Sequence, residues 1–176
     1  MIFTIGHSTR PIGEFVRLLG AHQIELLADV RTIPKSRYNP QFNIEALAKS
    51  LKDAQIEYLH EPGLGGLRHA RKDSINLGWR NASFRGYADY MQTEEFRDNL
   101  EKLVGLGTNK RIAIMCAEAV PWRCHRSLIS DALLARGIVA LHIVGTDDPK
   151  PHTLTSFAVI RGAEVTYPDE NLRLAL

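Results

Sequence analysis

The chain has little of several features that define other classes of protein. It has only two cysteines in 176 residues, too few for a disulfide scaffold, so we expect a reducing, cytoplasmic compartment. Its longest apolar runs, such as residues 112–115 and 138–141, are a handful of residues, so we expect no membrane span or membrane partner. Residues 1–6 lack the regions of a signal peptide and are typical of a strand. The length and mixed composition predict one domain over residues 1–176.

Short apolar runs alternate with amphipathic stretches along the chain, which is typical of an α/β fold. The pattern predicts strands at 2–5, 25–30, 56–59, 111–116 and 138–144, with helices at 11–22, from a cap at Asn43, within 84–106, and at 124–136. Thr93 is a predicted internal cap, and Gly105 or Gly107 a predicted helix end. A hairpin turning at 161–162 is expected near the C-terminus. Because helices connect the strands, we expect a mostly parallel, open sheet of about five strands with helices on both faces.

Residues capable of chemistry follow the predicted strands. In an open parallel sheet, ligands bind beyond the carboxyl ends of the strands. The side chains found there include His7, Ser8, Arg31, Arg37, His60, Cys116, Glu118, Arg123, Cys124, His125 and Arg126. This set is richer in histidine, arginine and cysteine than the polar loops of an ordinary soluble α/β protein, and it predicts a functional site at this edge of the sheet. His22, His142 and His152 are expected to be structural or solvated.

The two cysteines stand at either end of the most informative segment. A predicted strand ends at Cys116, a seven-residue loop follows, and Cys124 opens a predicted helix together with His125 and Arg126. Free amides at a helix start favour an anion and lower the pKa of a nearby thiol. Either cysteine is therefore a candidate nucleophile. Its base is expected among His125, His60 and His7, with Glu118 a further catalytic candidate and Arg123 and Arg126 binding an anion. The alternative is two buried, inert cysteines.

A metal is a second use for the same side chains. Cys116, Cys124 and His125, with His7 or His60 from other strands, are candidate ligands for zinc or iron. Two observations argue against such a site: adjacent residues on a helix point about 100° apart, and the chain has no short Cys-x-x-Cys pair. The sequence therefore assigns no metal ligand.

Two long connections combine basic and aromatic residues. Residues 31–43 contain Arg31, Lys35 and Arg37 and no acid, and residues 61–90 combine arginines with aromatic rings. Such interleaving suits phosphate contacts together with base stacking, as in single-strand binding. Solvated loops with anchoring aromatics are the alternative. Residues 63–66 contain three glycines, which allow close approach of the backbone to a ligand.

The motifs as a set resemble a known family. They are Gly6-His7-Ser8-Thr9, Asp29-Val30-Arg31 with Pro34 and Asn39-Pro40-Gln41-Phe42, His60-Glu61-Pro62 with Leu64-Gly65-Gly66, Gly86-Tyr87-Ala88-Asp89-Tyr90-Met91, and Cys116-Ala117-Glu118 leading to Cys124-His125-Arg126. Together they are similar to the family catalogued as domain of unknown function 488. The resemblance covers nearly the whole chain and implies a single cytoplasmic α/β domain with a shared site at the strand ends. Some relatives carry a DNA-repair label.

The layout of the cysteine loop also resembles rhodaneses and tyrosine phosphatases. However, seven positions separate Cys116 from Arg123, where a phosphatase loop has six, and no histidine precedes the cysteine. The likeness is therefore one of layout.

Three interpretations of function follow from the sequence. The leading one is an anion-binding protein whose pocket accepts a phosphorylated small molecule or single-stranded nucleic acid, with a nucleotide or a nucleic-acid end as the expected ligand. Its charge-binding candidates are Arg31, Arg37, Arg68, Arg123 and Arg126, and its stacking candidates are Trp79, Tyr87 and Tyr90. The alternatives are a cysteine-dependent enzyme and a metal-dependent enzyme with Cys and His ligands. A structural interaction module accounts less well for the residues at the strand ends.

Overall fold

A six-stranded sheet forms the centre of the fold in a computed structural model, which describes residues 1–171. The strand order is β3-β2-β4-β1-β5-β6. The strands are β1 (Ile2–Gly6), β2 (Leu26–Asp29), β3 (Glu57–His60), β4 (Ile112–Cys116), β5 (Ala140–Ile143) and β6 (Lys150–Pro151). The first five are parallel, and β6 adds an antiparallel edge to β5. The predicted mostly parallel α/β sheet is thus confirmed, with β6 too short to leave a pattern in the sequence.

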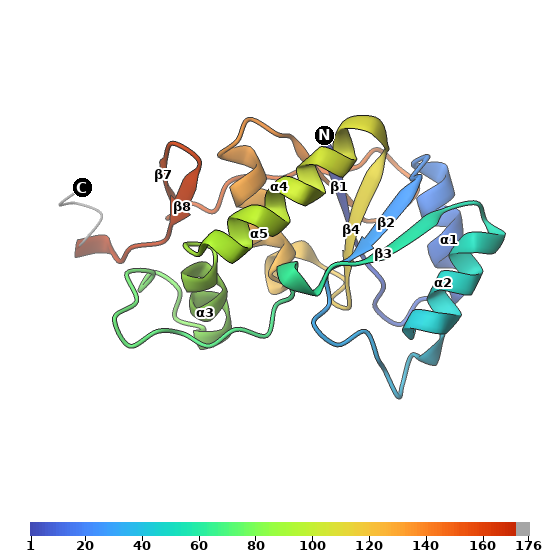
Figure 1. Cartoon of the computed structure of the whole chain (residues 1–176), viewed down its shortest axis with the longest axis horizontal. Coiled ribbons are helices and arrows are strands. Elements are labelled where there is room, and N and C mark those ends of the chain that lie inside the picture. The colour runs from blue at the N-terminus through green and yellow to red at the C-terminus, as the bar shows by residue number, and fades with distance from the viewer. Residues whose placement is uncertain (172–176) are drawn as a thin grey trace.

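Among residues 1–171, five helices flank the two faces of the sheet (Figure 1). They are α1 (Ile12–Ala21), α2 (Ile44–Asp53), α3 (Ala82–Tyr90), α4 (Glu94–Asn109) and α5 (Arg126–Leu134). Successive strand residues point to opposite faces, so β1 places Phe3 against the cluster that holds α1 and α2, and Ile2 against the cluster that holds α3, α4 and α5. None of the described helices is long and apolar enough to cross a membrane.

Several element boundaries differ from the predictions. Thr93 does cap α4, accepting from the Phe96 amide at 3.2 Å. Asn43 occupies the cap position of α2, but its side-chain Oδ1 accepts from the Ser36 amide at 2.6 Å and fixes the preceding loop instead of capping the helix. The prediction that Gly105 or Gly107 ends a helix was wrong, because α4 continues to Asn109.

The predicted hairpin is present near the C-terminus. Strands β7 (Val159–Arg161) and β8 (Glu164–Thr166) pair in antiparallel fashion. Gly162 lies at the turn with φ of +61°, a left-handed conformation that glycine adopts without steric penalty.

The register of the sheet brings the candidate segments together. Gly6 at the end of β1 is paired with Cys116 at the end of β4, and Asp29 at the end of β2 is paired with Met115 and His60. The three central strands, β2, β4 and β1, therefore end side by side at one edge of the sheet. The connections that follow β2 and β3 and the loop between β4 and α5 start from this edge.

Candidate functional site

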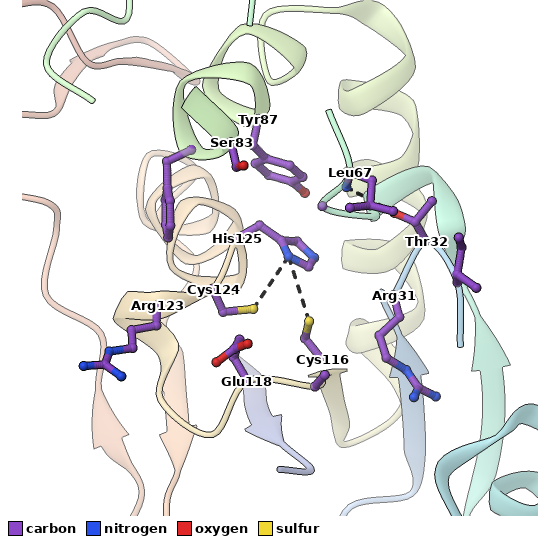
Figure 2. Close-up of a pocket in the computed structure, with 14 residues that line it drawn as sticks. Arg31, Thr32, Leu67, Ser83, Tyr87, Cys116, Glu118, Arg123, Cys124 and His125 are labelled. Atoms are coloured by element: carbon purple, nitrogen blue, oxygen red, sulfur yellow. Dashed lines mark hydrogen bonds between the residues drawn. The ribbon is translucent and has the colours of Figure 1, made fainter. Parts of the chain in front are cut away.

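Two thiols and one imidazole converge at the carboxyl end of the central strands. The Nδ1 atom of His125 lies 3.6 Å from the sulfur of Cys124 and 4.0 Å from that of Cys116. The three potential ligand atoms all lie within 4.8 Å of one another, and this is the only such group among the described residues. Figure 2 shows both sulfurs pointing toward the same ring nitrogen.

The orientation of the His125 ring is set by its other nitrogen. Nε2 lies 3.1 Å from the carbonyl oxygen of Val30, directly after β2. A carbonyl only accepts, so Nε2 carries a proton and donates it. In the neutral ring the lone pair therefore lies on Nδ1 and faces the two sulfurs. A backbone carbonyl on the distal nitrogen is the arrangement that orients histidine ligands in metal sites.

The pKa values of the two cysteines are shifted in opposite directions. The hydrogen bond from the Cys116 thiol lowers the pKa of Cys124 well below its ordinary value, and the charge of Arg126 acts in the same direction. The same hydrogen bond, together with burial, raises the pKa of Cys116. Of the two cysteines, Cys124 is therefore the one that more readily forms a thiolate. A thiolate is the form of cysteine that acts as a nucleophile and as a metal ligand.

Arg126 is the cation beside this thiolate. Its side chain is only 1% exposed, and Nε donates to the Cys124 sulfur at 3.4 Å. Nη2 donates to the carbonyl oxygen of Glu118. Within residues 1–171 Arg126 forms no ion pair with a carboxylate. Because a guanidinium stays charged and an uncompensated buried charge is strongly destabilising, the thiolate of Cys124 is the counter-charge in direct contact with it.

The local backbone explains how neighbouring side chains reach one point. The prediction that a helix begins at Cys124 was wrong, since α5 begins at Arg126 and Cys124 is extended, with φ of −140° and ψ of 146°. His125 is the residue that precedes the helix, with φ of −55°. The angular argument against a shared metal assumed that both residues lie on one helix. Because the chain bends between them, both side chains face Cys116.

Two glycines make room for the site. A Cβ atom on Gly66 would lie 2.4 Å from His125 Nδ1, and one on Gly6 would lie 1.9 Å from the carbonyl oxygen of Glu118. The glycines of residues 63–66 do allow close approach, as the sequence indicated, but Gly66 receives a side chain of the protein itself. Gly6 allows the loop between the cysteines to lie directly on the end of β1.

A cavity of about 420 Å³ opens next to the two sulfurs. The predicted site residues that line it are Arg31, Tyr87, Cys116, Glu118, Arg123, Cys124 and His125. Other walls come from Thr32, Ile33, Gly66, Leu67, Ser83, Phe84 and Ala117. The pocket is thus polar and sulfur-rich at its base and largely apolar around its sides, the usual character of a small-molecule site.

The other predicted histidines are engaged elsewhere. His60 Nε2 lies 2.9 Å from the carbonyl oxygen of Arg31, and His60 does not line the cavity. His7 bonds through Nδ1 to the carbonyl of Ser8 and through Nε2 to Arg31, at 2.7 and 3.2 Å. Burial lowers the pKa of His7 to about 4, so it is neutral at pH 7. His7 and Ser8 line an adjoining hollow of about 390 Å³ that shares Arg31 and Glu118 with the main cavity.

Most of the predicted anion-binding arginines already have partners. Arg31 is 7% exposed and forms a two-point pair with the buried Asp29, with Nε 2.8 Å from Oδ1. Arg68 lies over the Tyr90 ring, its guanidinium carbon 3.5 Å from the ring centroid. Arg123 is exposed at the cavity rim, and Arg37 is exposed but does not line the cavity.

The predicted stacking residues are largely packed inside the protein. Trp79 lies in a cluster with Phe84 at 4.7 Å between ring centroids and lines a different pocket. Tyr90 is 7% exposed, and its hydroxyl donates to the carbonyl of Gly63. Tyr87 is only 1% exposed, although its ring forms part of the cavity wall, 5.0 Å from that of His125.

The two sulfur–nitrogen distances are close to those of a tetrahedral metal site. Bonds of about 2.3 Å to sulfur and about 2.0 Å to nitrogen at tetrahedral angles place sulfur and nitrogen about 3.5 Å apart. The observed separations of 3.6 and 4.0 Å are close to this value. Three protein ligands leave a fourth position, as in catalytic zinc sites. The cavity lies beside all three residues.

Sequence reasoning missed several contributors to the site. The Val30 carbonyl that fixes His125 is a backbone group, which leaves no trace in residue type. Ile33 and Leu67 are exposed apolar residues of the long connections and carry no chemical signal. Ser83 and Phe84 come from the first turn of α3, whose placement over the cysteine loop depends on the tertiary fold.

Comparison with known proteins identifies a family. The family model described as Domain of unknown function DUF488 matches residues 11–133, which include both cysteines and His125. This match confirms the resemblance carried by the sequence motifs. No curated protein and no solved structure matches the chain.

Proposed function

The chain belongs to the DUF488 family, whose description gives no activity, and from the site itself we propose a metal-dependent enzyme with Cys116, Cys124 and His125 as ligands. The observation that carries the proposal is that Nδ1 of His125 lies 3.6 and 4.0 Å from the sulfurs of Cys124 and Cys116 while Nε2 contacts the carbonyl of Val30. Zinc suits two sulfur ligands and one nitrogen ligand.

The side chains around the triangle support this role. A zinc ion with three protein ligands supplies Lewis-acid chemistry, by activating water or polarising an oxygen of the substrate. Val30 fixes the His125 ring, and Arg126 stabilises the thiolate form of Cys124 before a metal arrives. The apolar walls around the cavity limit the access of bulk water to the sulfurs.

Two histidines provide the test of this proposal. His125 and His60 both donate from Nε2 to neighbouring carbonyls, those of Val30 and Arg31, but only His125 faces the thiols. Freshly purified protein is expected to hold close to one equivalent of zinc by elemental analysis. His125→Asn is expected to lose it, and His60→Asn to keep it.

Protein that binds no metal would contradict the proposal. Zinc-free wild-type protein that gains no thermal stability on addition of zinc or ferrous iron rules out the metal centre. Rapid alkylation of Cys124 in that protein would favour the cysteine-nucleophile alternative, for which the Arg126–Cys124 contact is the supporting observation.

Arg123 is the arginine that we propose binds an anionic group of the substrate. It is exposed at the rim of the cavity, and its side chain has no partner among the described residues, so it is available for a phosphate or carboxylate of the substrate. We expect adenosine monophosphate to bind more tightly than adenosine. Arg123→Gln is expected to lower the affinity for the monophosphate about tenfold, since a hydrogen bond to a charged group contributes about 1.5 kcal/mol.

Arg37 supplies the matched control for this measurement. It is also an exposed arginine, but it lies outside the cavity lining. Titrations followed by nuclear magnetic resonance should show no loss of affinity in Arg37→Gln. Equal binding of adenosine and its monophosphate, or an equal loss in both variants, would remove the role of Arg123.

A further inference from the structure

We propose that a buried relay of hydrogen bonds positions the sulfur of Cys124. The relay lies outside the cavity beside the cysteines. The relay consists of Asp131, His152, His142, Thr4 and Arg126, and the inference rests on the site proposed above. None of its members lines the cavity beside the cysteines. They are positioning residues, acting on the site through the Arg126 contact with sulfur.

Each link of the relay is a close contact between side chains. Asp131 Oδ1 lies 2.8 Å from His152 Nε2, and His152 Nδ1 lies 2.9 Å from His142 Nε2. His142 Nδ1 lies 2.8 Å from the hydroxyl oxygen of Thr4. Arg126 Nη1 then donates to that oxygen at 3.4 Å, while its Nε donates to the Cys124 sulfur at 3.4 Å.

The donors and acceptors of the relay are consistent along its whole length. Arg126 can only donate, and the carboxylate of Asp131 can only accept. Burial lowers the pKa of His142 to about 4, helped by the charge of Arg126, so His142 is neutral at pH 7. With neutral imidazoles, Thr4 donates to His142, His142 to His152, and His152 to Asp131. Every polar hydrogen between the cation and the anion then has one acceptor.

The fold holds the two ends of the relay rigidly. Arg126 and Asp131 both belong to α5, while Thr4 on β1 is directly paired with His142 on β5. Asp131 is fully buried and also accepts from the hydroxyls of Thr155 and Tyr167, at 2.7 and 2.8 Å. A buried carboxylate needs such compensation. The relay joins this carboxylate to the buried guanidinium, which has no carboxylate in direct contact within the described chain.

Thr4 is the best point at which to break the relay. It is fully buried, and its hydroxyl is the sole link between His142 and Arg126 in the relay. Thr4→Val removes the hydroxyl and keeps a similar shape, whereas Thr4→Ser retains the hydroxyl. We expect Thr4→Val to lower the zinc affinity about tenfold, the lower end of the about 10- to 100-fold cost of losing an outer partner of a metal ligand, because Thr4 acts on Cys124 through Arg126. Thr4→Ser should restore most of it.

Thr155→Val is the matched control. It removes a hydroxyl hydrogen bond to the same Asp131 but lies outside the path to Cys124. Zinc affinity is measured by competition with a chromophoric chelator, and thermal stability is measured on the metal-free variants. The relay predicts that both valine variants lose stability and that only Thr4→Val loses zinc affinity. Wild-type affinity in Thr4→Val, or an equal loss in Thr155→Val, would overturn it.

A second measurement tests the relay independently of metal binding. In chelator-treated protein, the rate of alkylation at Cys124 is followed by mass spectrometry, which distinguishes it from Cys116. The relay predicts several-fold slower alkylation in Thr4→Val than in wild type or Thr155→Val. If wild-type protein binds no zinc, the metal proposal fails and this rate alone decides on the relay. Equal rates in all variants would then reject the relay as well.

Discussion

Replacing Cys124 with serine is expected to lower the affinity for zinc at least about 100-fold, because loss of even an outer partner of a metal ligand costs about 10- to 100-fold. Cys124 contributes the thiolate of the pair and is held in that form by the Arg126 guanidinium. A serine hydroxyl does not ionise at neutral pH, so the ligand would lose its negative charge. Isothermal titration with zinc measures the change directly.

Comparison with two neighbouring positions makes this result specific. Cys116→Ser is expected to lose affinity as well, since its sulfur lies 4.0 Å from the same nitrogen. Ser127→Ala lies on the same turn and removes a hydrogen bond to the carbonyl of Cys124, at 3.0 Å, but removes no ligand. It should bind zinc nearly as wild type does. A Cys124→Ser protein with wild-type affinity would exclude this sulfur as a ligand.

Replacing Gly6 with alanine is expected to destabilise the protein by about 3 kcal/mol, at the upper end of the usual penalty for overpacking. The added Cβ would lie 1.9 Å from the carbonyl oxygen of Glu118 and 2.9 Å from the Cα of Ala119. Both are backbone atoms, so the end of β1 or the loop between the cysteines has to move. Because Arg126 donates to the same carbonyl, the displacement should also weaken zinc binding.

Gly13 provides the matched control for Gly6. It lies inside α1, and a Cβ atom there would meet nothing within 4 Å. Gly13→Ala is therefore expected to stabilise the protein by at most about 0.5–1 kcal/mol, the advantage of alanine over glycine in the middle of a helix, because Gly13 is the second residue of α1. Chemical denaturation of both variants gives the two free energies of unfolding. An unchanged stability in Gly6→Ala would show that the loop does not pack against β1 as described.

Hydrophobic periodicity predicted the fold well because the core is formed by ordinary amphipathic elements. The five parallel strands and the helices on both faces follow from apolar spacing alone. The helix ends were less predictable. Gly105 and Gly107 remain inside α4, and the two-residue β6 is too short to show any periodicity.

The site was predictable in part, because strand ends fix which segments meet but not how their side chains are used. Cys116, Cys124 and His125 do meet at the predicted edge. Their geometry depended on the extended backbone at Cys124, which a helix starting there would have excluded. Arg31 and Arg126 resemble exposed anion-binding residues in the sequence, yet both are buried and bonded within the protein. The relay through His142 and His152 joins residues far apart in sequence and is visible only in three dimensions.

Titration of metal-free protein with cobalt(II) tests the metal centre most directly, because this ion takes zinc sites and its spectrum reports its ligands. We predict saturation at one equivalent of cobalt, with thiolate-to-cobalt charge-transfer bands and the intense visible bands of four-coordinate cobalt. Added zinc should then displace the cobalt and abolish both. A spectrum that stays that of hydrated cobalt in the presence of folded protein, with reduced cysteines, would contradict the proposal that Cys116, Cys124 and His125 bind a metal.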